Sequence, residues 1–372
     1  MHPEVVGGRA RTPLRAGLRV LTVVAFLWGA GICGGIAAEP WRVGLLLPPE
    51  EVFRESLRRG AEAAVSRHNA KTNARPLELI VRGRSGQWGA DADEAGRLVL
   101  EDRVQILVAP PGAVPSHLVL QVSGRTRTPV ISLAHDDSIT GAGIPWAVRL
   151  VPSLRDEWGA LLRGGSWRFL VEAGRPAREL EREWERARVP VGGVGVDVRT
   201  NLEARVVGLE TGALSDEGVR QRARALVAES VDGVFLQLDP VQAARWVRAL
   251  RLAGFGGVLT GGGGLRSPGF VEAAGEAARG FRVTAMESSE APTRVAGSRS
   301  IDAAEGLAFE ALELAEALLE RAGDRPVCTV FPWSPGPTAG TPSGRWRFDR
   351  FGNREVRLEV LRWDGAAWNP LR

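Results

Sequence analysis

The sequence predicts an α/β protein with two doubly wound parallel-sheet lobes. Short apolar runs alternate with segments of helical periodicity, and this alternation restarts after Pro152. The chain of 372 residues is long enough for two domains of ordinary size. The pattern is clearest at residues 105–109 and 129–133, two apolar runs of strand length that flank a segment long enough for a helix.

The loops that follow these two runs, residues 110–116 and 134–140, form a predicted ligand-binding rim. Consecutive strands of a parallel sheet end at the same edge, and ligands bind just beyond that edge. Both loops are rich in turn-forming residues. We therefore expect them to line one side of a single cleft.

The first 38 residues predict a cleaved signal peptide. Four arginines precede an apolar run at residues 20–32, and small residues follow it. Cleavage after Ala37 or Ala38 would export the rest of the chain to the periplasm, with Cys328 as its single cysteine and no intrachain disulfide. A membrane anchor is the alternative, but a run of about 13 residues is shorter than the ~20 needed to span.

The charge distribution argues against nucleic acid as a partner. The chain has 48 basic and 44 acidic residues, and its formal net charge is +4 at pH 7. Nearly all of the basic residues are arginines, with Lys71 as the sole lysine, and they are interleaved with Asp and Glu throughout. No basic stripe of the kind that follows a phosphate backbone is present in the sequence.

The first part of the exported chain alternates strands and helices. An apolar strand is predicted at residues 41–47, and a helix at 53–70 with apolar and small residues on one face. A strand at 77–81 follows, and then a helix that either Asp91 or Asp93 would cap. The two strands at 105–109 and 129–133 complete this part.

The second part repeats the alternation. Its predicted helices are residues 156–163, 176–189, 215–229, 240–253, 268–277 and 301–322. Its predicted strands are residues 167–171, 231–236, 257–260, 281–285, 346–348 and 356–363. No strand is assigned within the valine-rich stretch 191–209, residues 287–300 are expected to form a crossover, and residues 328–343 are expected to form a loop.

The order and spacing of these segments resemble a known family. The segments that show it include WRVGLLLP, RRGAEAAVSRHNA, PPGAVPS, TPVISLAHDDSITGAGIPWAVRLVPS, VDGVFLQLDPVQAARWVRALRLAGF and GLAFEALELAEALLERAG. Together they resemble the branched-chain amino-acid type of ABC-transporter substrate-binding protein, a periplasmic binding protein of type I, over nearly all of the exported chain. The resemblance implies two lobes joined by a three-strand hinge that close on a small ligand. It places residues 39–150 plus 287–350 in lobe 1, and residues 151–286 plus 351–372 in lobe 2.

The resemblance also implies where a ligand would bind. The positions that match the family's binding residues, or that lie in the same loops, are Gly112, Ala113, Val114, Ala134, His135, Asp136, Glu172, Asp239 and Gly263. The first-lobe residues among them would bind first, and Glu172, Asp239 and the glycine run would engage on closure.

Several of these positions depart from the pattern of amino-acid-binding members. Ala113 replaces the hydroxyl residue that holds the ligand carboxylate, and Gly263 replaces the acid that grips the ligand ammonium. The aromatic residue that closes over the ligand is missing because the chain has no tyrosine, and Glu172 lies nearest its place. A buried ammonium without a partner carboxylate costs several kcal/mol. We therefore expect a retained fold with a different ligand, one without a free α-amino group.

Several residues have both a functional and a structural interpretation. His135, beside Asp136 and Asp137, either contacts a ligand or pairs with a neighbouring carboxylate, and the absence of a second His or Cys at suitable spacing argues against a metal site. Phe53 is expected to narrow the cleft. Trp88 either stacks on a ligand or packs between elements.

The glycine run at residues 261–264 is interpreted as a loop, because it lacks the Lys-Ser/Thr ending of a phosphate-binding loop. Glu172 and Asp239 either supply polar contacts to a ligand or are solvated loop carboxylates. An enzyme is not expected, because no serine has the G-x-S-x-G context of a nucleophile and Cys328 lies in a proline-rich segment.

The function that follows is a periplasmic solute-binding protein that delivers a small molecule to an inner-membrane ABC permease. We expect a monomer without cofactor or metal. The alternative is a protein with the same binding fold that acts in signalling or assembly through a protein partner and has no transported solute.

Overall fold

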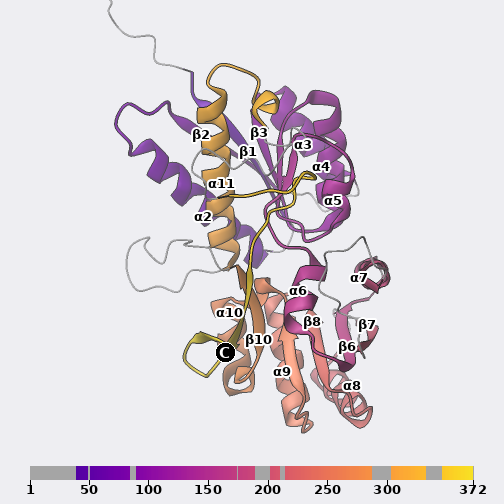
Figure 1. Cartoon of the computed structure of the whole chain (residues 1–372). Coiled ribbons are helices and arrows are strands. Elements are labelled where there is room, and N and C mark those ends of the chain that lie inside the picture. Colours follow the sequence, from indigo (N-terminus) through magenta and orange to yellow (C-terminus); the bar gives the residue numbers. More distant parts are fainter. Residues whose placement is uncertain are drawn as a thin grey trace, which may run out of the picture. The chain divides into compact units, whose positions relative to one another are not determined.

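The structure is a computed structural model, in which two sheets and their helices are arranged as Figure 1 shows. It describes residues 39–48, 51–83, 89–173, 175–188, 202–209, 214–286, 303–331 and 346–371. The predicted signal peptide, Trp88 and the predicted crossover at 287–300 lie outside the described residues. None of the described helices has the length and apolar character needed to cross a membrane.

The first sheet is entirely parallel and has the strand order β2-β1-β3-β4-β5. Its strands are β1 (Trp41–Leu47), β2 (Leu77–Gly83), β3 (Ile106–Ala109), β4 (Val130–Ser132) and β5 (Ala147–Arg149). The helices that pack with it are α2 (Glu51–Asn69), α3 (Ala90–Leu100), α4 (Ala113–Thr126), α5 (Ser138–Gly141) and α11 (Ala303–Ala322). Helix α11 comes after most of the second sheet in the chain, following its strand β10 (Arg282–Met286), yet it packs beside α2 (Figure 1).

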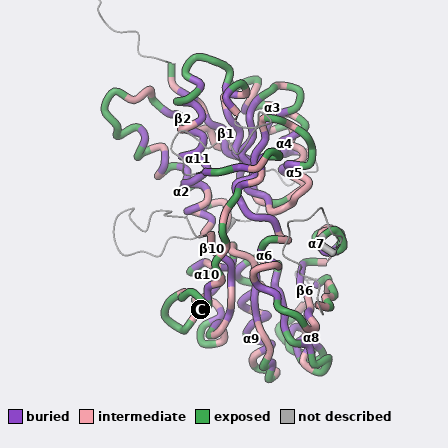
Figure 2. Tube along the Cα trace, viewed as in Figure 1, coloured by how far each residue is buried: buried purple, intermediate pink, exposed green. Residues whose placement is uncertain are grey.

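The residues of β1 explain why this sheet has helices on both faces. Successive strand residues point to opposite faces. Leu45 and Leu47 join Leu57 of α2 in one apolar core, whereas Leu46 joins Leu98 of α3 in another. A strand that is apolar on both faces can be covered only by helices on both sides. The buried strands and the exposed outer surfaces of the helices are visible in Figure 2.

The second sheet has the strand order β12-β11-β10-β9-β8-β6-β7, and only β11 and β12 join it antiparallel. Its strands are β6 (Gly165–Glu172), β7 (Leu202–Leu209), β8 (Gly233–Gln237), β9 (Val258–Gly261), β10 (Arg282–Met286), β11 (Leu358–Trp363) and β12 (Trp368–Pro370). Its helices are α6 (Leu154–Leu161), α7 (Arg175–Arg188), α8 (Asp216–Ala228), α9 (Pro240–Leu252) and α10 (Pro268–Ala274). The predicted α/β class with two mostly parallel sheets is therefore confirmed.

Aromatic side chains fix α6 and α7 on one face of the second sheet. Trp158 of α6 stacks on Phe169 of β6 at a centroid distance of 5.4 Å, and Trp184 of α7 meets Phe169 edge-on at 5.1 Å. Trp158 is fully buried, and Trp184 is nearly so. Large aromatic pairs of this kind dominate the packing energy of a core. Glu157 directly precedes Trp158, and Glu183 directly precedes Trp184. The packing of the two tryptophans therefore also holds these two glutamates in place.

Two predictions about strands differ from the structure. Strand β5 was not predicted, because a run of three residues is too short to show the alternation typical of a strand. No strand was predicted within residues 191–209, but β7 covers Leu202–Leu209. The strand predicted at 346–348 is reduced to a single bridge between Phe348 and Arg354.

Two predictions about helices also need correction. Neither Asp91 nor Asp93 caps α3, because the chain enters the helix from Gly89, whose φ of 87° is the left-handed conformation that glycine adopts readily. Asp91 lies buried in the first turn instead. The sequence also missed the short helix α5, which interrupts the predicted loop at 134–140.

The segments that connect the two sheets meet at Arg354. This side chain is 1% exposed and forms two hydrogen bonds to Glu310 of α11, at 2.7 and 2.9 Å. Its Nη1 also lies 3.5 Å from the carbonyl oxygen of Leu150 and 3.4 Å from the sulfur of Met286. Leu150 follows the last strand of the first sheet, and Met286 ends β10. One guanidinium thus contacts all three places where the chain passes from one sheet to the other.

Replacing Arg354 with Met should lower the free energy of unfolding by about 3–5 kcal/mol, because it leaves the Glu310 carboxylate buried without a cation. Chemical denaturation followed by tryptophan fluorescence measures the change. The double variant Arg354→Met with Glu310→Gln should recover most of the loss, since it leaves no buried charge. A single variant within about 1 kcal/mol of the unmodified chain would show that the ion pair does not hold these segments together.

Candidate ligand-binding pocket

A cavity of about 530 Å³ lies where strands of both sheets end. Its walls come from the loops after β1, β3 and β4 of the first sheet and after β6, β8 and β9 of the second. Helices α2, α6, α7 and α11, the end of β10 and the start of β11 complete the described part of the lining. The carboxyl ends of parallel strands are the usual ligand-binding edge of such sheets, and a cavity of this size accommodates a small organic molecule.

Eight of the eleven predicted site residues line this cavity. They are Phe53, Gly112, Ala113, His135, Asp136, Glu172, Asp239 and Gly263. Two others do not line it. Val114 lies one position further into α4, and Ala134 is fully buried in the core between the first sheet and its helices. Trp88 is outside the described residues.

The loop after β3 owes its shape to Gly112. Its φ of 110° is a conformation that few residues other than glycine adopt, and a side chain there would approach the ring of Pro115 at 3.3 Å. The hydroxyl group of Ser116 donates to the carbonyl oxygen of Pro110 and lies 3.1 Å from that of Ser132. The hydroxyl groups of this loop therefore stabilise the turn itself, and Ala113 at the cavity wall offers none.

His135 is oriented by the backbone. Its Nδ1 lies 2.9 Å from the carbonyl oxygen of Pro152 and 3.9 Å from Oε1 of Glu157, whereas the two adjacent aspartates bind other partners. Asp136 instead accepts hydrogen bonds from the backbone and side chain of Ser138, at 2.7 and 2.6 Å, and begins the turn that leads into α5. Asp137 pairs with Arg149 at 2.9 Å. Each residue of this loop thus has a separate partner.

A carboxylate that the sequence analysis missed lies against the glycine run. Oε1 of Glu157 accepts hydrogen bonds from the backbone N–H of Gly263, at 3.1 Å, and from the hydroxyl of Thr284, at 2.8 Å. Glu157 lines the cavity and is 2% exposed. A side chain at Gly262 would come within 2.9 Å of its Oε2. An acid is therefore present at this wall, although it comes from α6 and not from position 263.

The start of α6 shows how Glu157 is positioned. The hydroxyl of Ser153 accepts from the backbone N–H of Asp156, and the Asp156 carboxylate accepts from the backbone N–H of Ser153. This reciprocal capping box fixes the first turn of the helix. With Trp158 held in the aromatic core, the preceding residue is placed at the cavity. The sequence S-x-x-D before a tryptophan is the signal from which this could have been found.

Helix α7 supplies a second acid that the sequence analysis missed. Burial, followed by the negative charge of Asp136, raises the pKa of Glu183 to about 7, and Asp137 adds to the effect while Arg186 opposes it. Burial likewise raises the pKa of Asp137, although the nearby Arg149 lowers it. Glu183 and Asp136 both line the cavity. Near neutral pH the carboxyl group of Glu183 is therefore only partly ionised.

The described lining of the cavity is strongly acidic. Its carboxylate residues are Asp136, Glu157, Glu172, Glu179, Glu183, Asp239 and Glu310, against the single guanidinium of Arg266. Most of these acids already have partners among the described residues. Glu310 pairs with Arg354, Glu183 pairs with Arg186, and Asp239 accepts two backbone N–H groups as the N-cap of α9. The acids of the described lining nevertheless outnumber its one guanidinium.

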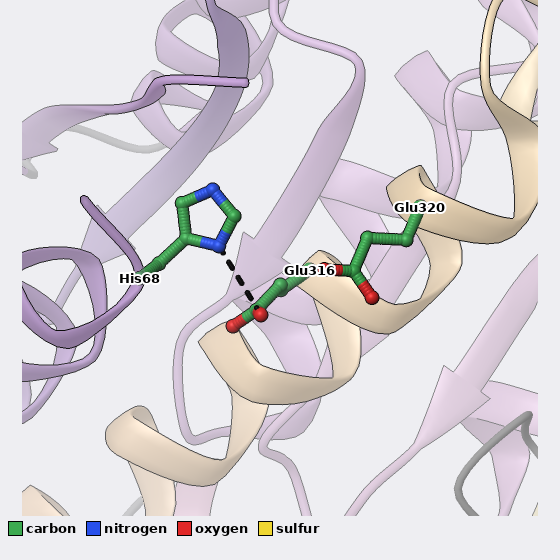
Figure 3. Close-up of side chains that lie close together, drawn as sticks. All are labelled: His68, Glu316 and Glu320. Carbon is green, nitrogen blue, oxygen red and sulfur yellow. Dashed lines mark ion pairs between the residues drawn. The ribbon is translucent and has the colours of Figure 1, made fainter. Parts of the chain in front are cut away.

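The described residues also contain one group of potential metal ligands away from this cavity, formed by His68, Glu316 and Glu320 (Figure 3). His68 is fully buried, and its Nδ1 lies 3.1 Å from a carboxylate oxygen of Glu316. Lys71 contacts the same oxygen, and Arg67 lies 3.7 Å from the other. Cationic side chains therefore occupy both oxygens, so the group joins α2 to α11 as an ion-pair network.

Solved structures of solute-binding proteins resemble this chain closely in fold. The leucine-binding protein LivK of Thermotoga maritima has a TM-score of 0.70 at 16% identity, over 89% of this chain and 98% of its own. LivJ of Streptococcus pneumoniae, in complex with isoleucine, has 0.69 at 13% identity, over 90% and 99%. A solute-binding protein of R. palustris, in complex with benzoate, has 0.69 at 16% identity, over 90% and 96%. No protein-family model and no curated protein sequence matches the chain.

The chain has the type I periplasmic binding protein fold. The resemblance that the sequence predicted is thus confirmed at the level of fold. The LivJ and benzoate-bound structures that have this fold are solute-binding proteins of ABC transporters.

Replacing Glu316 with Gln should lower the free energy of unfolding by about 1–3 kcal/mol at pH 7, because Lys71 and His68 lose their partner. Burial opposes ionisation of Glu316, but Lys71 and His68 outweigh it and hold its pKa below the usual 4.5. A depressed pKa stabilises the fold above 4.5, and the effect disappears as the pH falls through the folded-state value. The difference between the two proteins should therefore shrink below pH 4.5.

Denaturation at several pH values measures this difference. Glu320→Gln is the matched control, because its side chain is 52% exposed and its contact with Lys71 is long, at 3.9 Å. It should change stability by less than about 0.5 kcal/mol. Equal losses for the two variants would refute the assigned role of Glu316.

Proposed function

We propose that this chain is the solute-binding protein of an ABC importer, which captures a small organic ligand in the cavity and delivers it to an inner-membrane permease. The observation that supports this most directly is the cavity itself, lined by the strand-end loops of both sheets. Proteins of the same fold are ABC-transporter solute-binding proteins, and their structures include complexes with isoleucine, benzoate and 4-hydroxybenzoate. The chain is in this proposal a divergent member of that family and not an enzyme.

The proposed mechanism is closure of two lobes about the three connecting segments that meet at Arg354. The first-lobe loops, with Ala113 and His135, would hold the ligand in the open form. Glu172, Asp239 and Gly263 would engage on closing, so that the ligand has contacts in the closed form that the open form lacks. A ligand shifts such an equilibrium only through this difference in contacts.

The proposed ligand is not an ordinary α-amino acid. A zwitterion needs a donor set for its carboxylate, and Ala113 presents no hydroxyl group at the position where related proteins have one. Ser116 and Ser132 are engaged with the loop itself and with each other. The chain has no tyrosine to close over an amino-acid side chain.

The proposed location is the periplasm, reached through the signal peptide at residues 1–38, and the proposed state is a monomer. The boundaries of the lobes, residues 39–150 plus 287–350 and residues 151–286 plus 351–372, belong to the same proposal. Strand β11 pairs with β10, and β12 pairs with β11, which is consistent with placing residues 351–372 in lobe 2.

A second candidate function is signalling or assembly through a protein partner, without transport. The altered positions Ala113 and Gly263 favour it, because a protein that no longer binds a solute has no need of their usual side chains. The presence of a cavity of ligand size favours transport instead.

Thermal unfolding against a panel of amino acids, amides, short acids, alcohols, amines and aromatic compounds tests the proposal. A ligand at 100 times its Kd should stabilise the folded state by about 2.7 kcal/mol and raise Tm by a few degrees. Leucine, isoleucine and valine should leave Tm unchanged.

The variant Ala113→Trp, which fills the cavity at its first-lobe wall, should abolish the shift. Leu252→Trp is the control, because this side chain is 79% exposed on α9 and is not part of the cavity wall. A shift with leucine would show that the amino-acid role survives. No shift with any compound would favour the protein-partner function.

A further inference from the structure

We propose that the pocket binds an organic cation that has no carboxylate group, and that Glu157 together with the Asp136–Glu183 pair binds its charge. This rests on the proposed solute-binding function and specifies its ligand class. The ligand would be an amine or guanidine with an apolar body. Acidic residues are common on protein surfaces, so the inference depends on the burial and the contacts of these particular carboxyl groups.

Glu157 is the buried anchor of this arrangement. It is 2% exposed, and both of its described donors, Gly263 and Thr284, bind the same oxygen, Oε1. The other oxygen, Oε2, has no hydrogen-bond partner among the residues that the structure describes, and it lies beside Gly262 in the cavity wall. His135 Nδ1 is 3.9 Å from Oε1 but is engaged with a backbone carbonyl. A buried carboxylate without a counter-cation is costly, and a ligand cation would remove that cost.

Asp136 and Glu183 form the second anchor. They come from the loop after β4 and from α7, and both line the cavity. The groups around them are Asp137 on the same loop and Arg186 on α7, with Arg149, Arg155 and Asp156 near Asp137. Two carboxyl groups so placed do not both ionise without repulsion. A proton on Glu183 relieves the repulsion in the empty pocket, and a ligand cation would relieve it in the filled one.

This substitution of a cation for a proton links binding to pH. The pKa of Glu183 is raised to about 7, first by burial and then by Asp136. Below that value Glu183 is mostly protonated, and a cation must displace its proton to bind. Above it the proton is already lost, so affinity should rise with pH and level off well above 7.

The same walls exclude a ligand carboxylate. Arg266 is the single guanidinium in the described lining, against the acids named above. Apolar side chains make up much of the remaining cavity wall, including Phe53, Leu154, Leu180 and Leu307. An aliphatic or aromatic body with one cationic end matches this distribution, whereas a zwitterion would place its carboxylate among carboxylates.

Three matched sets of compounds test the inference by isothermal titration calorimetry with the purified chain. Each set contains an amino acid, its decarboxylated amine and its deaminated acid: leucine, arginine and phenylalanine with their counterparts, such as 3-methylbutylamine and 4-methylpentanoate for leucine. At least one amine should bind, and it should bind ten-fold or more tightly than its amino acid and its acid. Its affinity should rise several-fold between pH 6 and pH 8. Below pH 7, buffers of different ionisation enthalpy should reveal proton release.

Variants separate the two anchors. Glu157→Gln should weaken amine binding by about 10- to 100-fold, the usual effect of a charged hydrogen bond. Glu183→Gln should remove most of the pH dependence. Glu217→Gln, an exposed acid of α8, is the control and should change neither. Unchanged amine affinity in Glu157→Gln, or an unchanged pH dependence in Glu183→Gln, would overturn the inference.

The outcomes also distinguish this inference from the proposed function. Binding of the amino acids or of the deaminated acids in preference to the amines would overturn the cationic ligand and leave the solute-binding function intact. If none of the nine compounds bound, the cationic ligand would be rejected, and the wider panel described above would decide whether any solute binds.

Discussion

The buried ion pair between Arg354 and Glu310 is the constraint on which the arrangement of this molecule depends. Its two side chains are each 1% exposed, and Arg354 also contacts Leu150 and Met286. The three connecting segments therefore share one charged centre. An isolated charge at this depth is strongly unfavourable, so each partner requires the other. Glu310 also lines the cavity, which places the junction of the two sheets directly beside the candidate site.

The aromatic core of the second sheet positions the acids of the cavity. Glu157 precedes Trp158, and Glu183 precedes Trp184. Adjacent residues on a helix point about 100° apart, so a tryptophan fixed in the core places its neighbour at the edge of the buried face. At that edge, Glu157 and Glu183 line the cavity. The packing of uncharged side chains thus determines where the negative charge lies at the cavity wall.

The sequence predicted the fold and much of the cavity, because both follow from the ends of apolar strands. Runs such as Ile106–Ala109 are recognisable from composition, and the topology of a parallel sheet brings their loops together. It did not predict Glu157 or Glu183, because a glutamate on an amphipathic helix is ordinarily solvated. Whether it faces water or a cavity depends on how the helix packs. The irregular β7 and the three-residue β5 have too weak a period to be found from sequence.

The fold itself does not determine the charge of the ligand. Structures with TM-scores of 0.69 to this chain contain isoleucine in one case and benzoate in another, a zwitterion and an anion. The selective element must therefore be the side chains that the common backbone presents. In this chain the glycine run presents no side chain to the cavity. The carboxylate of Glu157, from α6, lies beside the run and accepts a hydrogen bond from the backbone N–H of Gly263. In the proposed binding mode, an acid supplied from a different element, with a carboxylate pair nearby and no hydroxyl at Ala113, would retain the recognition of positive charge and remove that of a carboxylate. Such a change requires only a few side chains to differ, which is why the fold can persist while the ligand changes.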